Sequence, residues 1–273
     1  MDSIKISAFN DFIASAGEPL DEQAKADFYN STSGHKNEID GYNCTKCNNR
    51  GYIAKIDEYG CMYLSHCECL KKHEVLAEAK RSGLGNLLKD YTFDKYIATQ
   101  SWQESIKKLA MEFCINPSAR WFFLGGQSGA GKTHLCSAIC AHYLKSGTDV
   151  KYMVWASDAP KLKSLANDPQ YQQEIKKFKD ATVLYIDDFL KVRANERPTN
   201  ADMRLAFEIL NDRQRDDNKI TIVSAEKSLD DMMGYDEATL GRLYQSTGKY
   251  KAFISPRAGR NYRLRTQETK NIL

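Results

Sequence analysis

The chain of 273 residues has no long apolar run, no recognisable secretory leader and no internal repeat. No apolar stretch approaches the ~20 residues that a membrane-spanning helix requires, which argues against a membrane protein or a membrane partner. Residues Met1–Lys5 show neither the basic start nor the apolar core of a signal peptide, so we expect a cytoplasmic protein.

The composition is that of an ordinary globular protein, with 42% hydrophobic and 27% charged residues. At about 150 residues per domain, this length suggests two units. The net charge of +3 hides an asymmetry: residues 1–43 carry three basic and eight acidic side chains, whereas residues 236–273 carry eight basic and three acidic ones. Two solvated faces would explain these counts. The functional alternative is an acidic head for a protein partner and a basic tail near nucleic acid or nucleotide phosphates.

Residues 126–133 match G-x-x-x-x-G-K-[ST], the phosphate-binding loop of P-loop NTPases. They are Gly126, Gln127, Ser128, Gly129, Ala130, Gly131, Lys132 and Thr133. An apolar run leads in and a helix-like stretch leads out, so backbone N–H groups and a helix N-terminus would both face an anion. Lys132 is predicted to reach the β- and γ-phosphates of ATP, and Thr133 to bind Mg²⁺. We include the next residue, His134, in the predicted nucleotide site.

A second part of an ATP site follows further along the chain. The apolar residues 183–186 are followed directly by Asp187 and Asp188. A buried strand that ends in carboxylates is the Walker-B arrangement. We predict that Asp187 holds the Mg²⁺ shell and that Asp188 orients or deprotonates the attacking water. The alternative is an ordinary strand that ends in a polar turn.

Five of the eight cysteines lie between residues 44 and 69. A Cys-x-x-Cys knuckle followed about twenty residues later by a second pair can close a tetrahedron around Zn²⁺. The predicted ligands are Cys44, Cys47, Cys67 and Cys69, with His66 and Cys61 as alternatives for the fourth position. Disulfides are a disfavoured alternative in a reducing cytoplasm. A redox Cys-x-x-Cys is also disfavoured, because no thioredoxin-like unit surrounds the knuckle. Reduced thiols that bind no metal remain an open alternative. A module this short would take its folding energy from the metal.

Four segments are predicted: a helical partner-binding segment at 1–42, a zinc-binding module at 43–72, a helical linker at 73–115 and an ATPase domain at 116–273. Before the ATPase domain we expect helices near 4–16, 20–29, 71–90 and 102–113. Within it, strands are expected near 121–125, 150–155, 182–187, 219–224 and 250–254, and helices at 132–145, 157–178, 200–215 and 236–245. Apolar strands that alternate with helices predict an α/β fold with a parallel five-stranded sheet buried on both faces.

Taken together, these features resemble the AAA+ helicase loaders of the DnaC/DnaI type, and in particular their phage and prophage members. The resemblance covers most of the chain, and the cysteine module ahead of a short P-loop core is its most selective part. The matching segments are Cys44–Leu70, Tyr91–Asp94, Gly126–Thr133, Ile186–Asp188, Ser224–Glu226, Gly241–Tyr244 and Asn261–Arg263.

The resemblance implies a small AAA+ ATPase that delivers a hexameric, ring-shaped replicative helicase to single-stranded DNA, with ATP binding and hydrolysis as its switch. In such proteins the N-terminal region grips the helicase. The core binds ATP and single-stranded DNA, and assembles side by side with other copies. The expected cofactors are ATP, Mg²⁺ and Zn²⁺. Candidate DNA contacts are Lys161, Lys163, Lys176 and Lys177, between the second and third strands of the core.

The resemblance also implies roles for further residues. Arg242 matches the arginine finger, which reaches the γ-phosphate held by the neighbouring subunit, and Arg263 falls near a sensor-2 arginine. Glu226 stands where the family usually has a sensor-1 asparagine, and a carboxylate donates no hydrogen bond unless it is protonated. Asp188 stands where many members have glutamate, and its shorter reach implies slow hydrolysis that a partner or DNA stimulates. The predicted catalytic residues are Asp188, Arg242 and Lys132.

Two other functions stay open. An IstB-type transposition helper ATPase has the same core but normally lacks the cysteine module. A binding protein that holds ATP or DNA without turnover, such as a helicase-binding adaptor or inhibitor, belongs to a different class. Single-turnover hydrolysis with and without helicase and single-stranded DNA separates these functions.

Overall fold

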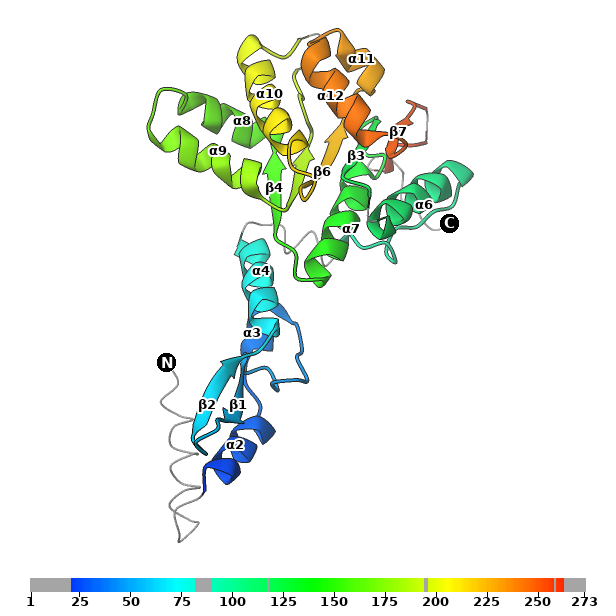
Figure 1. The fold of residues 1–273 in the computed structure, drawn as a ribbon. Helices are drawn as coiled ribbons and strands as arrows, with labels where there is room; N and C mark the ends of the chain where they lie inside the picture. The colour runs from blue at the N-terminus through cyan, green and yellow to red at the C-terminus, as the bar shows by residue number, and fades with distance from the viewer. Residues whose placement is uncertain (1–20, 82–89, 117, 194–195, 258, 263–273) are drawn as a thin grey trace. The chain divides into compact units, whose positions relative to one another are not determined.

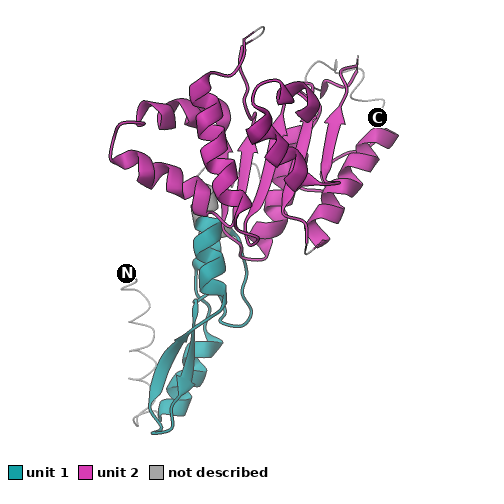
Figure 2. Cartoon of the chain, turned by 45° about the horizontal axis from the view of Figure 1, so that its top comes forward, with its two compact units in different colours: residues 1–77 teal, residues 78–273 magenta. Residues whose placement is uncertain are grey.

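The computed structural model describes residues 21–81, 90–116, 118–193, 196–257 and 259–262. It divides the chain into two compact units, residues 1–77 and 78–273 (Figure 2). The helix expected near 4–16 lies outside the described residues, as do residues 82–89 of the helix expected over 71–90. Within the described ranges, no helix combines the length and apolar character needed to cross a membrane.

Unit 1 contains an antiparallel hairpin that the sequence did not predict, because its strands are short and half-exposed. The Asn30 amide joins the first helix to this hairpin: it donates to the Ala54 carbonyl and accepts from the Ala54 N–H, both at 2.9 Å. The elements of unit 1 are α2 (Glu22–Ser31), α3 (Lys36–Asp40), β1 (Tyr52–Ile56), β2 (Met62–His66) and α4 (Cys69–Arg81), which continues past the unit's last residue (Figure 1).

Unit 2 contains the parallel five-stranded sheet that the sequence predicted. In chain order its strands are β3 (Trp121–Gly126), β4 (Val150–Val154), β5 (Val183–Asp187), β6 (Ile220–Ala225) and β7 (Lys251–Ile254). Their order across the sheet is β4-β5-β6-β3-β7, and every neighbouring pair is parallel. Each strand begins and ends within one residue of its predicted position. The P-loop strand β3 therefore lies inside the sheet, with β6 between it and the carboxylate-bearing strand β5.

Helices cover both faces of this sheet. On one face, the Phe122 ring of β3 packs against Phe113 of α6, with ring centroids 5.3 Å apart. The next residue, Phe123, points the other way and joins the core formed with α8 through α12. The helices of unit 2 are α6 (Ser101–Ile115), α7 (Lys132–Lys145), α8 (Trp155–Ser164), α9 (Gln170–Asp180), α10 (Asn200–Gln214), α11 (Leu229–Met233) and α12 (Glu237–Thr247) (Figure 1).

The prediction of one helix over 157–178 is wrong: the structure has two helices there. α8 ends at Ser164 and α9 begins at Gln170. The turn between them is closed by a hydrogen bond from the Asp168 N–H to the Leu165 carbonyl at 2.7 Å. Pro169 explains the break, because a proline disfavours helical conformation in the residue before it but fits the start of a new helix. The sequence also did not predict the short helix α11.

A buried arginine joins three elements of unit 2. Arg213, near the end of α10, has no exposed surface. Its guanidinium donates to Thr221 Oγ1 (2.9 Å), to the Ala181 carbonyl (2.7 Å) and to the Ile220 carbonyl (2.6 Å). Burial lowers the pKa of Arg213 to about 10, so the group stays charged at neutral pH. Its role is to satisfy backbone groups at the ends of α9 and β6, away from the candidate site.

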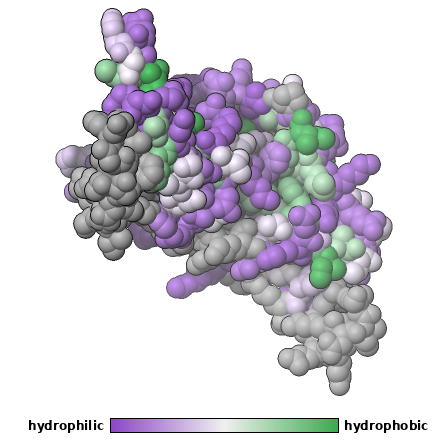
Figure 3. All heavy atoms as spheres, turned by 90° about the horizontal axis from the view of Figure 1, so that it is seen from below, coloured by the Kyte–Doolittle hydropathy of each residue, from purple (hydrophilic) through white to green (hydrophobic). Residues whose placement is uncertain are grey.

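Several large apolar side chains are exposed on both units. They include Tyr59, Tyr63, Leu64, Ile97, Met111 and Ile115. On the face that Figure 3 shows, hydrophobic residues form small patches within a hydrophilic surface. Scattered exposure of this kind is normal for folded proteins, so none of these patches defines a docking site by itself.

Candidate functional site

The P-loop connects β3 to α7 and depends on its glycines. Gly126, Gly129 and Gly131 have φ angles of 145°, 75° and 88°, a region that other residues rarely adopt. A Cβ on Gly129 would lie 1.9 Å from Asn261 Oδ1, and a Cβ on Gly126 would lie 2.7 Å from the Ile254 carbonyl oxygen. Only glycine fits these positions, and the resulting tight curve leads into a helix N-terminus that can bind an anion.

The Lys132 side chain folds back over this loop. Its ammonium donates to the carbonyls of Gly126 (2.7 Å) and Gln127 (3.0 Å), and the residue is buried. Burial lowers the pKa of Lys132, while nearby carboxylates, first among them Asp188, oppose that shift. A buried cation whose partners are neutral carbonyls is suited to phosphate, because phosphate offers it charge-assisted hydrogen bonds.

Asp187, the last residue of β5, lies at the centre of a hydrogen-bond network beside the P-loop. Thr133 Oγ1 is 3.3 Å from both of its carboxylate oxygens. Tyr152 donates to Oδ2 at 2.9 Å, Tyr185 donates to Oδ1 at 2.8 Å, and Ser224 also donates to Oδ1. These donors hold the carboxylate in one orientation, which makes Thr133 and Asp187 a pair of oxygen ligands suited to Mg²⁺.

The sequence assigned no role to Tyr152, Tyr185 and Ser224. The fold alone brings Tyr152 of β4 and Ser224 of β6 beside the end of β5. Burial and the Asp187 charge raise the pKa of both Tyr152 and Tyr185. Both phenols therefore remain protonated and continue to donate at neutral pH.

Asp188 and Glu226 are joined by a lysine that the sequence did not single out. Lys191 Nζ lies 2.9 Å from Asp188 Oδ2 and 2.9 Å from Glu226 Oε1. Burial tends to lower the pKa of Lys191, but its hydrogen bonds to these two carboxylates raise it overall. Asp188 and Leu190 have φ angles of 54° and 53°. This left-handed conformation costs about 1–2 kcal/mol per non-glycine residue and is typical of functional sites.

A cavity of about 460 Å³ lies over these residues. The P-loop, Asp187, Asp188 and Lys191 form its charged end. The rest of its wall comes from the segments before α6, from α6 itself and from the end of the described chain, through Tyr91, Lys95, Tyr96, Ile97, Gln103 and Tyr262. A cavity lined both by charged residues and by three tyrosines matches the phosphates and the base of a nucleotide.

His134, which we placed in the nucleotide site, lines this cavity and also supports its wall. Its Nε2 lies 2.9 Å from the Thr92 carbonyl oxygen, and its ring lies edge-on to Tyr96 with centroids 5.2 Å apart. The Tyr262 N–H donates to the Gly129 carbonyl at 3.0 Å. The segment after β7 is thereby held against the P-loop. Arg263, the next residue, lies outside the described residues.

Arg242 is not part of this cavity. It lies on α12, where Nη1 donates to the Ala238 carbonyl at 2.5 Å and the guanidinium carbon lies 5.0 Å from the centroid of the Phe207 ring of α10. The described residues that line the cavity include none from α10 or α12. A role for Arg242 at a nucleotide therefore requires the nucleotide site of a second copy.

The four lysines considered as DNA contacts are engaged within the chain. The pairs are Lys161–Asp158 (3.4 Å), Lys163–Asp202 (2.5 Å), Lys176–Asp180 (3.8 Å) and Lys177–Glu174 (2.5 Å). Exposed pairs contribute roughly 0–1 kcal/mol and exchange readily. Lys163 differs, because its partner Asp202 is buried and forms the capping box of α10 with Thr199.

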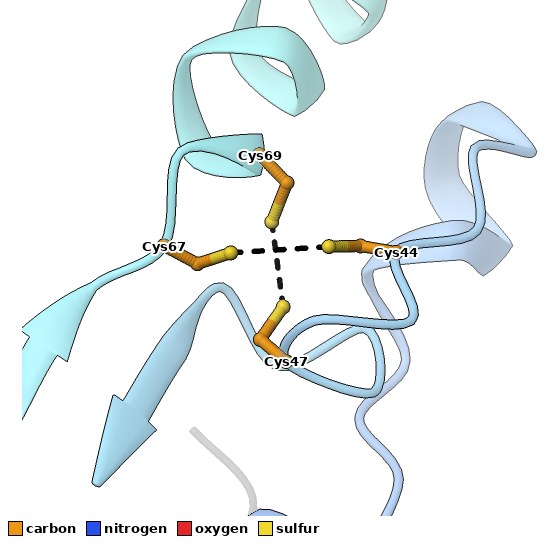
Figure 4. A group of neighbouring side chains, drawn as sticks. All are labelled: Cys44, Cys47, Cys67 and Cys69. Carbon is orange, nitrogen blue, oxygen red and sulfur yellow. Dashed lines mark hydrogen bonds between the residues drawn. The ribbon is translucent and has the colours of Figure 1, made fainter. Parts of the chain in front are cut away.

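Unit 1 brings four cysteine sulfurs together within 4.8 Å of one another (Figure 4). They are the predicted ligands Cys44, Cys47, Cys67 and Cys69, and all four are buried. The sulfurs of Cys44 and Cys67 are 3.8 Å apart, and those of Cys47 and Cys69 are 3.4 Å apart. A tetrahedron with Zn–S bonds of about 2.3 Å has edges of about 3.8 Å. A disulfide needs about 2.05 Å. The geometry fits a metal and does not fit disulfides.

The two alternative ligands lie outside this cluster. Cys61 is exposed, and the His66 ring packs edge-on against Tyr52 at 5.2 Å. The knuckle itself turns through Gly51, whose φ is 82° and whose N–H lies 3.2 Å from Cys47 Sγ.

A P-loop and a hydroxyl-supported carboxylate at the carboxyl ends of β3 and β5 define a P-loop NTPase. Residues 87–246 match the family model of the bacterial DnaA ATPase domain. This match covers more than half of the chain, so the chain belongs to that family. An ATPase-type nucleotide site is therefore a property of its family as well as of its geometry.

The chain is also similar to two Bacillus subtilis proteins and to several chromosomal replication initiator proteins DnaA. The chain is 26% identical to YqaM of Bacillus subtilis, described as uncharacterized, over 77% of this chain and 70% of that protein. It is 25% identical to the phage-like element PBSX protein XkdC of the same bacterium, over 78% of this chain and 82% of that protein. It spans less than half the length of the curated DnaA proteins it matches.

Two solved structures share the fold of the core. The DnaC helicase loader superposes with a TM-score of 0.52 at 21% identity, over 62% of this chain and 98% of that chain. DnaA bound to AMPPCP and single-stranded DNA superposes with a TM-score of 0.51 at 20% identity, over 62% of this chain and 50% of that chain. The resemblance to helicase loaders is thus confirmed for the fold.

Proposed function

We propose that this chain is an ATP-dependent loader that delivers a ring-shaped replicative helicase to single-stranded DNA. The observation that carries the proposal is a separate four-cysteine unit ahead of a AAA+ nucleotide site. The fold shared with the DnaC helicase loader and the similarity to XkdC of a phage-like element support it. AMPPCP and single-stranded DNA in the related DnaA structure support the same two ligands here.

The proposed division of labour follows the four segments. Residues 1–42, whose charge is strongly acidic, would contact the helicase in the cytoplasm. The metal module at 43–72 and the linker at 73–115 would hold that segment to the ATPase domain at 116–273, which would bind DNA and assemble side by side with other copies.

The nucleotide site would hold ATP with Mg²⁺ through residues already in place. Thr133 and Asp187 would ligate the ion, while Lys132 and the P-loop N–H groups would bind phosphate oxygens. When bound, Mg²⁺ neutralises charge that develops on the β- and γ-phosphate oxygens. Asp188 would orient a water whose oxygen bonds to the γ-phosphorus as the bond to ADP breaks, and the water proton leaves with the released phosphate. We infer slow turnover without a partner, since Asp188 is ion-paired to Lys191.

The cysteine cluster would hold one Zn²⁺. Four buried sulfurs from a knuckle and a second pair are the donor set of structural zinc sites. Burial raises the pKa of Cys67 and Cys69, so a bound cation is what would keep these thiols ionised. Apart from the cluster, the described part of this unit consists of short helices and a two-stranded hairpin, which are too small to bury a sufficient core.

Cys44→Ser should remove the zinc and unfold unit 1, because zinc binding supplies about 10–16 kcal/mol to such modules. Elemental analysis should give one zinc per parent chain and none in the variant, and hydrogen exchange should rise over the α2 and hairpin segments. Cys61→Ser is the matched control, since Cys61 is exposed and outside the cluster, and it should keep its zinc. Equal zinc in the Cys44 variant would contradict the assignment.

Helicase loading itself can be tested with the replicative helicase of the replicon that encodes this chain, circular single-stranded DNA and ATP. We expect the chain to accelerate helicase transfer to the circle severalfold, only when ATP is present, as read by displacement of an annealed oligonucleotide. Binding to helicase without transfer or turnover would identify an adaptor or inhibitor instead. No helicase binding, with stimulation of strand transfer by a transposase, would identify an IstB-type helper.

A further inference from the structure

Lys191 occupies a position in unit 2 that neither the P-loop nor the Walker-B strand requires. Its ammonium lies between Asp188 and Glu226, at 2.9 Å from each, and the residue also lines the nucleotide cavity. It thus links the carboxylate expected to orient water, the residue at the sensor-1 position and the space where the γ-phosphate would lie. Its side chain is 37% exposed, so it has room to move.

The fold enforces this position. Phe189 is buried, its N–H donates to the Ser224 carbonyl at 2.8 Å, and its ring packs against Trp155 at 5.0 Å. The residues on both sides of Phe189 take the left-handed conformation, and the Lys191 N–H closes the turn by donating to the Asp188 carbonyl at 3.0 Å. A turn that is both anchored and strained directs Lys191 back toward the cavity.

We propose that Lys191 is the γ-phosphate sensor of this ATPase. Without nucleotide its ammonium binds Asp188 and Glu226; with Mg-ATP it turns to the γ-phosphate and leaves Asp188 free to orient water. This rests on the proposed binding and hydrolysis of ATP. Lys191 is a positioning residue for Asp188, and it supplies the N–H donors that Glu226 lacks as a carboxylate.

Electrostatics favour the transfer of the Lys191 ammonium from Asp188 and Glu226 to the γ-phosphate. Ion pairs that are about one-third exposed are weak, whereas an ammonium bound to phosphate makes a charge-assisted hydrogen bond. ADP has no γ-phosphate, so with ADP the two ion pairs persist. Lys191 therefore distinguishes ATP from ADP, and Glu226 competes with the γ-phosphate for it.

Lys191→Met removes the charge and keeps the length of the side chain. We expect it to weaken binding of a non-hydrolysable ATP analogue roughly 10-fold or more, with ADP affinity changed by less than about twofold, and to slow single-turnover hydrolysis. Lys219→Met is the matched control: Lys219 also pairs with two carboxylates, Asp212 and Asp216, but lies just before β6 and outside the cavity. It should bind both nucleotides like the parent.

We expect Glu226→Gln to change the affinity for the ATP analogue in the opposite direction to Lys191→Met. A purely structural role of Lys191 would not produce this opposite change. Removing the competing carboxylate should tighten binding of the ATP analogue and spare ADP. The double variant with Lys191→Met should bind like Lys191→Met alone, because the gain acts through the lysine. Equal loss for ATP analogue and ADP in Lys191→Met, no loss for either, or a gain that survives in the double variant would overturn the proposal. If the parent itself binds no ATP, the proposed function fails first; if it binds and the variants do not differ, only the sensor assignment fails.

Discussion

Replacing Lys132 with alanine will weaken the binding of Mg-ATP at least about 100-fold and abolish hydrolysis, while leaving unit 2 folded. The Lys132 ammonium is buried within the loop and donates to two backbone carbonyls. We therefore expect its main contribution to be the free energy of binding to a nucleotide phosphate. Hydrogen bonds to charged groups contribute about 1.5–3 kcal/mol each, and every 1.4 kcal/mol is about tenfold in affinity. Titration calorimetry with a non-hydrolysable ATP analogue measures this loss directly.

Lys145→Ala is the matched control, because Lys145 is exposed at the other end of the same helix, α7. It should bind ATP like the parent. Thermal denaturation of both variants checks that unit 2 remains folded. Undiminished affinity in the Lys132 variant would remove the basis for reading residues 126–133 as a phosphate-binding loop.

Arg242→Ala should lower the rate of ATP hydrolysis about 10³-fold under conditions in which copies assemble, if turnover depends on a finger. Binding of ATP by the single chain should not change, because Arg242 lies on α12 and outside the cavity of its own copy. Charge on the transferring phosphoryl group is what an arginine from a neighbouring copy would stabilise. Steady-state hydrolysis and the sedimentation of ATP-bound chains measure the two effects.

Mixing Arg242→Ala chains with Lys132→Ala chains should restore part of the activity, since some interfaces then pair one intact P-loop with one intact finger. Arg204→Ala is an informative comparison, because Arg204 is exposed on α10 beside Phe207, the ring that Arg242 covers. Loss of hydrolysis in the Arg204 variant alone would assign the arginine-finger role to Arg204 on α10. Parent-like hydrolysis in both variants would contradict an arginine finger at either position. The chain would then be better interpreted as a nucleotide-binding adaptor.

Local chemistry explains why much of this protein could be predicted from its sequence. The P-loop is a run of eight residues whose glycines are required by the backbone itself, as the positive φ angles of Gly129 and Gly131 show. The apolar strands β3 and β5 are recognisable from their own residues, because they are buried on both faces of the sheet. The break at Pro169 was missed although its cause is also local, since the charged and apolar pattern continues on both sides of it.

Residues far apart in the sequence account for what could not be predicted. An arginine is a surface residue by default, yet Arg213 is buried because four backbone carbonyls and one hydroxyl converge on it only in the folded chain. Likewise, the aromatic wall of the nucleotide cavity comes from segments before α6 and after β7. These two segments come together because of the order of the strands in the sheet. The hydrophobic periodicity of the sequence does not encode that order.

The sequence by itself determined which groups are the candidates for the proposed chemistry: the phosphate loop, the Walker-B carboxylates and the cysteine pairs, each marked by short spacing along the chain. The tertiary structure decided how they are used. It selected Cys69 over His66 and Cys61 by bringing four sulfurs within 4.8 Å of one another. It placed Arg242 outside its own cavity and set Lys191 between Asp188 and Glu226. Distance in space, which is set by strand order and by packing, separates a side chain that can act at a site from one that cannot.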